Sequence, residues 1–416
     1  MKRYLFDNFN LFTFFSIIIL YISLLIGFYY NENSTGGAFT DYYGHKQISI
    51  SFANDFLNTF LNFDKTQTRH SPVIIILFSF FEKFQVNDFL IRLINLHICL
   101  ILPVIFYKCL KIKFNDINKK YLILLSGLIF LSPTFRSLSI WPDSRIWGLL
   151  FFCLSIHYFL LYKNDKNFRY CVYVVFFYSI SSYFSPNFSV FSIYFMFYFF
   201  KDLNLKEVVS LLILNLVLSI PAFYYIFILD INFMFSATAA PGGSEDADNN
   251  VFNKILIISS IIFFYMTPFL VSKSININFK KINIVNFIFL LILFSISTYF
   301  YNYKFEYTGG GIFFKLSTFL FDNNLFFFIV VLVSLILNYL IFSASINNLL
   351  IILLLILNNP QLTIYHKYYD PFLLILFLTL FDLDFLKKKL FSQRSIYIFY
   401  LFSIFFLLLS ISKSYV

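Results

Sequence analysis

The stretch "LFTFFSIIILYISLLIGFYY", residues 11–30, decides the fold class of this chain. A helix needs about 20 consecutive apolar residues to cross a hydrocarbon core of roughly 30 Å, and this uncharged run has that length. It follows the basic start "MKR", and no small-x-small cleavage pattern comes after it. We therefore expect residues 11–30 to remain as a transmembrane helix rather than to be removed as a signal peptide.

Similar apolar runs recur along the whole chain of 416 residues. The sequence is 60% hydrophobic and 12% charged, with a mean hydropathy of +0.79, a composition that a soluble core does not use. It predicts an all-α, polytopic integral membrane protein with about 13 transmembrane helices. The expected spans are 11–30, 88–109, 121–140, 145–162, 170–184, 188–200, 207–229, 254–272, 283–301, 325–343, 346–358, 371–384 and 395–411.

One apolar stretch, "SPVIIILFSFFEKF" at 71–84, is left out of this set. As a helix it reaches only about 21 Å, short of the roughly 30 Å hydrocarbon core. We expect it to lie at the membrane interface or to form a re-entrant segment. With this stretch excluded and the N-terminus in the cytoplasm, Lys and Arg are in excess in the cytoplasmic segments, as the positive-inside rule requires.

The charge and the cysteines exclude other classes of function. The net charge is +10, but the basic residues lie mainly between apolar runs, where lipid head groups account for them, so no nucleic-acid partner is expected. The four cysteines lie in apolar stretches without the spacing of a zinc site or a disulfide framework. They are expected to serve in helix packing.

A single polytopic domain is expected over 1–416, with its larger polar segments on the outer face of the membrane. Residues 31–87 form a long first outer loop with short interfacial helices, and 88–200 form the core helices. The remaining helices occupy 201–416. Further outer loops are expected near 230–253, 302–324 and 358–370. Because the polar segments gather on this side, we expect the activity there.

The first outer loop contains "GGAFTDYYGHKQ", residues 36–47. A helix over 38–50 places Asp41 and His45 on one face, next to Tyr42. A second acid, Asp143, lies in "WPDSR" with Arg145 beside it. Isolated charges in outer loops are usually only solvated, but acids and histidines at helix mouths of a charge-poor chain favour a functional site.

Two other outer segments are less informative. "GGSEDAD", residues 242–248, favours a solvated acidic loop over a calcium site because its acids lack the alternating spacing of a calcium loop. "TGGGIFFK", residues 308–315, lacks the Gly-Lys-Ser/Thr ending of a phosphate loop and is interpreted as a lid or a turn.

The order of these features resembles the glycosyltransferase C superfamily, in the branch of protein O-mannosyltransferases and lipid A aminoarabinose transferase. The first loop with its acid is followed by "RHSPVIIILFSFFEKF", then by an arginine-bearing helix, "NDFLIRLINLHICLILPVIFYKCL", and then by the second acid in "IWPDSRIWGLLFFCLSIHYFL". "HKYYDPFLLILFL" is similar to the family's late Lys/Arg-Tyr-Pro segment. The resemblance covers 1–165 and this late segment.

The resemblance implies an enzyme of the bacterial inner (plasma) membrane that builds the cell envelope. Such enzymes move a sugar from a polyprenyl-phosphate donor to a hydroxyl of a lipid, glycan or protein acceptor, with inversion. Asp41 matches the first-loop acid and is expected to be the base, while Asp143 matches the second acid. The resemblance assigns no definite cofactor, and a divalent metal held by Asp41 and Asp143 stays open.

The expected substrate-binding residues follow from the same match. Arg69 or His70 and Lys367 match positions that hold the lipid phosphate, and Arg145 is expected to join them as a hydrogen-bond donor. Tyr369 is expected to stack on a sugar. His45 is placed in the same site, where it either orients Asp41 or faces water.

The chain also departs from the family pattern. Many relatives have two adjacent acids in the first loop, whereas Thr40 precedes Asp41, and Ser71 stands where the aminoarabinose transferase has a lysine before the proline. Two other classes stay open. A surface-polysaccharide polymerase or ligase would have its functional residues in a large outer loop late in the chain. A transporter would have charged residues at the bilayer midplane.

Overall fold

Helices account for the regular structure of every described segment. The computed structural model describes residues 11–66, 68, 70–231, 250–275, 283–305, 309–343, 345–359, 363–382 and 387–414, and these contain no β-strand. The expected all-α class is therefore confirmed for this part of the chain. The chain divides into two compact units. Unit 1 comprises 1–236 with 400–416, and unit 2 comprises 237–399.

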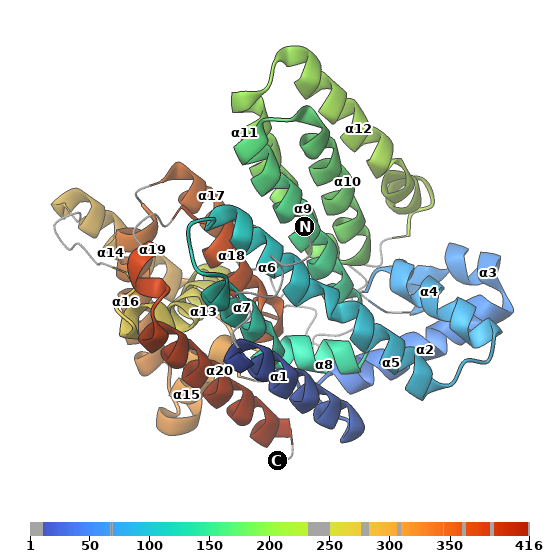
Figure 1. Ribbon diagram of the computed structural model, residues 1–416, viewed down its shortest axis with the longest axis horizontal. Helices are drawn as coiled ribbons and strands as arrows, with labels where there is room; N and C mark the ends of the chain where they lie inside the picture. The colour runs from blue at the N-terminus through green and yellow to red at the C-terminus, as the bar shows by residue number, and fades with distance from the viewer. Residues whose placement is uncertain are drawn as a thin grey trace. The chain divides into compact units, whose positions relative to one another are not determined.

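Unit 1 contains residues 31–87 and the helices that precede and follow them in the sequence, which Figure 1 labels. Its helices, of which the last begins in unit 2, are α1 (Leu11–Tyr29), α2 (Ala38–Asn54), α3 (Phe56–Leu61), α4 (Pro72–Lys83), α5 (Asp88–Cys99), α6 (Ile101–Lys113), α7 (Lys119–Gly127), α8 (Pro133–Ile140), α9 (Ser144–Asp165), α10 (Phe168–Phe184), α11 (Ser192–Asp202), α12 (Leu205–Phe223) and α20 (Gln393–Ser414). Short 3-10 turns lie at η1 (Phe63–Thr66), η2 (Leu128–Leu131) and η3 (Pro186–Phe191), and α12 continues into a π-helical turn, η4 (Tyr224–Ile228).

Unit 2 is built from α13 (Val251–Val271) and the helices packed around it. α13 contacts α14, α15, α16, α17 and α18. The elements of this unit are α14 (Ile284–Tyr299), α15 (Gly311–Phe321), α16 (Leu325–Phe342), α17 (Ile346–Leu357), η7 (His366–Tyr368), α18 (Phe372–Thr379) and α19 (Lys387–Leu390).

Long apolar helices identify an integral membrane protein. Seven described helices are long and apolar enough to cross a bilayer, namely α1, α5 with α6, α9, α12 with η4, α13, α16 and α20. An eighth is the pair Lys119–Leu131 and Pro133–Ile140, which is bent by 63°. The expected count of thirteen is not confirmed. The other five expected spans fall on α10, α11, α14, α17 and α18, of which α10 is the longest at 17 residues.

The described part of residues 31–87, which were expected to form the first outer loop, is largely helical, as the sequence predicts. The helix expected over 38–50 is present as α2, and the apolar stretch at 71–84 forms the 12-residue α4. α2 packs along α4. At 1.5 Å per residue, α4 is about 18 Å long and too short to span the bilayer. The loop between α1 and α5 is therefore a packed substructure rather than an extended chain.

The bend between η2 and α8 is the feature that most affects the functional site. Ser132 caps α8, since its side chain accepts the Phe135 N–H, and Pro133 occupies the first turn. Proline has no N–H to continue the preceding helix and disfavours a helical conformation in the residue before it. The run expected as one straight span over 121–140 therefore breaks at Ser132, and α8 leads directly to Asp143.

Candidate functional site

Three predicted site residues of unit 1 lie together. Asp41, His70 and Asp143 each offer one oxygen or ring nitrogen, and these atoms all lie within 4.8 Å of one another. The residues are far apart in sequence and come from α2, from the segment before α4 and from the start of α9. Asp143 is buried, and the other two are half-buried. The expectation that the two acids share a site thus has direct geometric support within unit 1.

Asp41 owes its position to the start of α2. Gly37 precedes the helix, and the Asp41 N–H donates to the Gly37 carbonyl at 3.0 Å, which places the carboxylate in the first turn. A carboxylate there is favoured by the partial positive charge of a helix N-terminus. His45 follows one turn later on the same face, as the four-residue spacing predicts.

His70 is held by the cap of α4. Ser71 accepts the Val73 N–H at 3.3 Å, and its hydroxyl also donates to the carbonyl of Tyr183 in α10. Ser71, which directly precedes Pro72, therefore caps a helix and ties α4 to α10. This anchoring fixes the residue just before it, and His70 Nδ1 lies 3.3 Å from Ser144 Oγ.

Asp143 is the N-cap of α9. Its Oδ1 accepts the N–H of Arg145 at 2.7 Å, and its side chain is 1% exposed. The carboxylate of Asp143 thus caps α9 and also lies in the cluster with Asp41 and His70. Arg145 lies in the first turn of the same helix and is half-buried.

His45 is packed against His70 rather than against water. Its side chain is 2% exposed, and the two imidazole rings meet edge to face with centroids 4.3 Å apart. The water-facing alternative for His45 is therefore wrong. Packed in this way, His45 supports the ring of His70 at the cluster.

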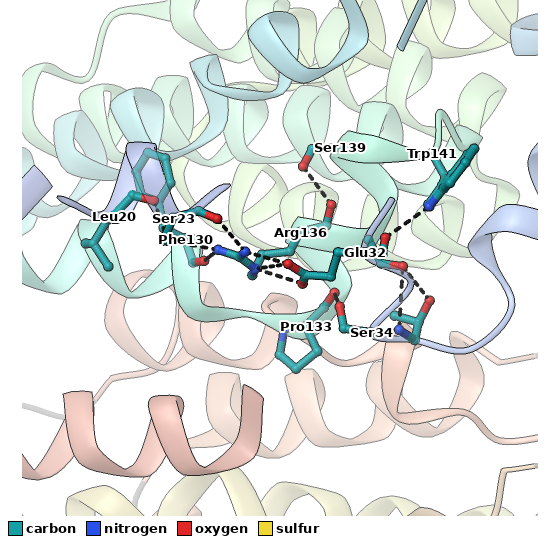
Figure 2. A network of polar contacts seen from close by, with 11 residues as sticks. Leu20, Ser23, Glu32, Ser34, Phe130, Pro133, Arg136, Ser139 and Trp141 are labelled. Atoms are coloured by element: carbon teal, nitrogen blue, oxygen red, sulfur yellow. Dashed lines mark hydrogen bonds and ion pairs between the residues drawn. The ribbon is translucent and has the colours of Figure 1, made fainter. Parts of the chain in front are cut away.

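A buried ion pair joins the chain segments that carry the two acids (Figure 2). Arg136 Nε donates to both carboxylate oxygens of Glu32, at 2.8 and 3.0 Å. The side chains are only 5% and 8% exposed for Arg136 and Glu32, respectively. The Arg136 guanidinium also donates to Ser23 Oγ at 3.0 Å and to the Ser23 carbonyl at 2.8 Å, near the end of α1. Charge and hydrogen-bonding capacity are thus satisfied together, as a buried pair requires.

Further hydrogen bonds fasten residues 32–35 to α8 and its end. Trp141 Nε1 donates to the Glu32 carbonyl at 3.0 Å, and Ser34 Oγ donates to the Pro133 carbonyl at 2.8 Å. Thr35 Oγ1 and Ser137 Oγ are 3.0 Å apart. We call this set, with the Glu32–Arg136 pair, the α8 latch. The segment 32–35 leads into α2, which carries Asp41, and Trp141 lies two residues before Asp143. The latch therefore holds together the two chain segments that lead to the two acids of the cluster.

Arg92 of α5 supports the latch from its other side. Its guanidinium carbon lies 3.6 Å from the centre of the Trp141 ring, and its Nε donates to the Ile140 carbonyl at 3.1 Å. Asn95, one turn along, donates to the Ser139 carbonyl at 2.7 Å and accepts Trp147 Nε1–H at 2.8 Å. A cation stacked on an indole and bonded to the backbone fixes the end of α8.

A second set of charges lies at the start of α5. Lys46 forms ion pairs with Asp88 and, at 3.9 Å, with Glu82. Burial lowers the pKa of Lys46, but the hydrogen bond and charge of Asp88 outweigh it, so the net pKa is raised above the usual 10.5. Burial also raises the pKa of Glu82. Because the folded pKa of Lys46 is raised, its stabilising contribution is present below pH 10.5 and is lost only above it.

Unit 2 contains the late predicted residues. Lys367 lies in η7, half-buried, with its ammonium 5.2 Å from the centre of the Tyr365 ring. Tyr369 is fully buried, and its hydroxyl donates to the Leu355 carbonyl at 3.3 Å. A ring packed in this way presents no face to a sugar. The stacking role expected for Tyr369 therefore has no support from its position.

Arg69 and the acidic stretch 242–248 lie outside the described residues. His70 is therefore the member of the "RH" pair that has a described place.

Comparisons with models of protein families, with curated proteins and with solved structures find no match for this chain.

Two carboxylates and an imidazole this close together support two kinds of chemistry. A partly desolvated carboxylate is a general base, and the imidazole beside it orients or neutralises an oxygen anion. The same donors are also a three-ligand set for a divalent ion such as Zn²⁺. In both cases the residues act on an oxygen nucleophile or on an oxyanion.

Sequence reasoning found the three cluster residues but missed the latch. Glu32 was not singled out, although it follows the apolar run 11–30 directly. Arg136 stands alone in the apolar run 121–140. An isolated acid and an isolated cation at the ends of two apolar runs are a signal for a buried pair, because neither charge is tolerated alone in a membrane helix.

Proposed function

We propose that this protein is a membrane glycosyltransferase that moves a sugar from a polyprenyl-phosphate donor to a hydroxyl acceptor on the outer face of the membrane. The observation that supports it is the approach of Asp41, His70 and Asp143 to within 4.8 Å of one another. The order of motifs in the chain resembles that of the glycosyltransferase C superfamily, in which Asp41 and Asp143 match the two acids and His70 matches a position that holds the lipid phosphate.

In the proposed reaction the acceptor oxygen attacks the anomeric carbon of the donor. Asp41 takes the hydroxyl proton as the new C–O bond forms. The bond between the anomeric carbon and the phosphate oxygen breaks, and its electron pair leaves with the polyprenyl phosphate. Attack opposite the leaving group inverts the anomeric centre.

The other residues act on charge and orientation. A phosphate leaving group is already anionic, so it needs cations rather than a strong acid, and His70 of the cluster and Arg145 in the first turn of α9 are the proposed donors. Asp143 fixes the first turn of α9 and, with it, the place of Arg145. The phosphate role predicted for Lys367 rests on the order of motifs in the chain alone.

A divalent ion is the competing occupant of the cluster. A carboxylate that ligates a metal is not available as a base, so the two arrangements exclude each other at Asp41. We place the base role first because it accounts for the acid in the first turn of α2 and for the absence of a second adjacent acid in the first loop.

The test is a strain that lacks the gene, complemented with variants of the whole protein. Asp41→Asn is expected to abolish the mass increment of one sugar on the surface glycolipids or glycoproteins, measured by mass spectrometry. The matched control is Asp55→Asn, which changes an exposed acid of the same loop. Asp55 caps α3 by accepting the Asn58 N–H, and asparagine caps equally well.

Wild-type glycan in the Asp41→Asn strain would overturn the assignment of Asp41 as the base. A deletion strain whose surface glycans are unchanged, with the gene expressed in the parent, would overturn the proposed function itself.

A further inference from the structure

Gly44 is a glycine in the interior of α2 that the backbone of the helix does not require. It is exposed and lies well inside this 17-residue helix. Glycine in a helix interior is destabilising relative to alanine, because it loses more backbone freedom on folding. The φ angle of Gly44 does not lie in the left-handed region that favours glycine. The backbone conformation thus gives no reason for glycine at this position.

Packing within the protein gives no reason for this glycine either. A Cβ atom added at Gly44 would have no atom within 4 Å outside its chain neighbours and the backbone of its own helix. Two other helix glycines of unit 1 differ in this respect. An added Cβ would lie 2.8 Å from Ser185 Cβ at Gly148 and 2.9 Å from the Tyr400 hydroxyl oxygen at Gly127. The space beside Gly44 is therefore open, and a side chain at this position would occupy it.

This open space lies next to Asp41 on the surface of α2. Gly44 follows Asp41 by three residues, so it lies about 4.5 Å further along the helix axis and about 60° around it. On one side of Asp41, Tyr42 and His45 are each 2% exposed. On its other side, Thr40 and Gly44 are both exposed. A molecule that reaches the Asp41 carboxylate along the open surface of α2 therefore passes over Thr40 and Gly44.

The proposed reaction indicates which substrate lies there. A general base must come within about 2.6–3.2 Å of the oxygen whose proton it takes, so the acceptor hydroxyl contacts Asp41. Attack from the side opposite the leaving group puts the polyprenyl phosphate beyond the anomeric carbon, away from the base. The groups that carry the acceptor hydroxyl are therefore nearer to Gly44 than the phosphate is.

We propose that Gly44 is a specificity-determining residue, which leaves room beside Asp41 for the part of the acceptor next to its reacting hydroxyl. This inference rests on the proposed transfer reaction and adds the place of the acceptor to it. The absence of a side chain at Gly44 then serves the substrate, while the helix itself would be more stable with alanine.

The test measures sugar transfer by purified full-length variants, added in detergent to membranes of the strain that lacks the gene. These membranes supply both donor and acceptor, and mass spectrometry gives the initial rate of the mass increment of one sugar. The rate is expected to fall in Gly44→Ala and to fall by roughly a hundred-fold in Gly44→Leu, the effect of displacing a reacting group by about 1 Å. Gln47→Leu is the matched control and is expected to keep the wild-type rate, because it adds leucine to an exposed position of α2 further from Asp41.

Thermal unfolding separates this role from a structural one. Gly44→Ala is expected to unfold at the wild-type temperature or a higher one while its transfer rate falls, because alanine favours the helix and contacts no other segment. If Gly44→Ala unfolds at a lower temperature than wild type, the glycine serves the fold and the inference is overturned.

A binding measurement tests the placement of the acceptor. The affinity for radiolabelled farnesyl phosphate, a probe for the leaving group alone, is expected to be equal in wild type and Gly44→Leu. Weaker binding by the variant would place the phosphate at Gly44 and would overturn the inference.

The outcomes also separate this inference from the proposed function. A wild-type transfer rate in Gly44→Leu, when Asp41→Asn transfers no sugar, would overturn the inference alone. Wild-type protein that transfers no sugar in the membranes of the deletion strain would overturn the proposed function, and the inference with it.

Discussion

Arg136 donates to both carboxylate oxygens of Glu32 from its Nε, at 2.8 and 3.0 Å, and both side chains are almost completely buried. This pair connects the end of α1 and the approach to α2 with α8. It therefore links, through covalent neighbours, the segments on which Asp41 and Asp143 lie.

We predict that Arg136→Met lowers the free energy of unfolding by about 3–5 kcal/mol, because it leaves Glu32 as a buried, uncompensated charge. Thermal unfolding in detergent measures the effect. The double variant Glu32→Met, Arg136→Met removes both charges and is expected to be more stable than the single variant. A single variant no worse than the double would contradict the account of the latch.

Asp143 allows the role of helix cap to be separated from the role in the cluster. Asparagine is as good an N-cap as aspartate, so the free energy of unfolding of Asp143→Asn is expected to lie within about 0.5 kcal/mol of the wild-type value. The same variant is expected to lose sugar-transfer activity. Asp143→Ala is expected to lose about 1 kcal/mol as well. Normal sugar transfer by Asp143→Asn would show that only the cap matters.

The two possible roles of the cluster, with Asp41 as a base or with a bound divalent ion, predict opposite responses to chelation. If Asp41 is a base, sugar transfer by purified protein is expected to be unchanged by EDTA. Activity that is lost with EDTA and returns with Zn²⁺ or Mn²⁺ would assign Asp41, His70 and Asp143 to a metal instead. His70→Ala then serves as the second probe, since it removes a ligand without touching either acid.

Two glycines with nearly the same backbone angle test the packing at α15. Gly36 has φ +77° with nothing within 4 Å of an added Cβ, and Gly310 has φ +79° with an added Cβ 2.3 Å from the Phe314 ring. Gly36→Ala is expected to cost about 1–2 kcal/mol, from the left-handed conformation alone. Gly310→Ala is expected to cost more, because the Phe314 ring must also move. Equal losses on thermal unfolding would contradict the tight packing.

Local sequence patterns predicted the elements of the site well. A helix over 38–50, which puts Asp41 and His45 on one face, was expected, and α2 covers it. The short apolar stretch at 71–84 predicted a helix too short to span the membrane, and α4 has that length. Both predictions depend on neighbours in the sequence, where helix period and length are decisive.

Long-range features were harder to predict. The span expected over 121–140 is divided at Ser132 and Pro133 into two segments bent by 63°. This break was not predicted, because the sequence around a proline in an apolar run does not distinguish a kinked helix from a broken one. The contact of His70 with His45 depends on the packing of α2 on α4. The pairing of Glu32 with Arg136 joins residues 104 positions apart, which no periodicity detects.

The membership of α20 in unit 1 has a consequence for biosynthesis. Tyr400 donates from its hydroxyl to the Leu124 carbonyl at 2.9 Å, yet the intervening chain builds all of unit 2. Unit 2 is thus an insertion within unit 1. During translation the residues of the α8 latch emerge early, whereas residues 400–414 of α20, which belong to the same unit, are made only after unit 2. A nascent chain therefore holds the catalytic candidates before the ribosome has supplied the helix that contacts α7.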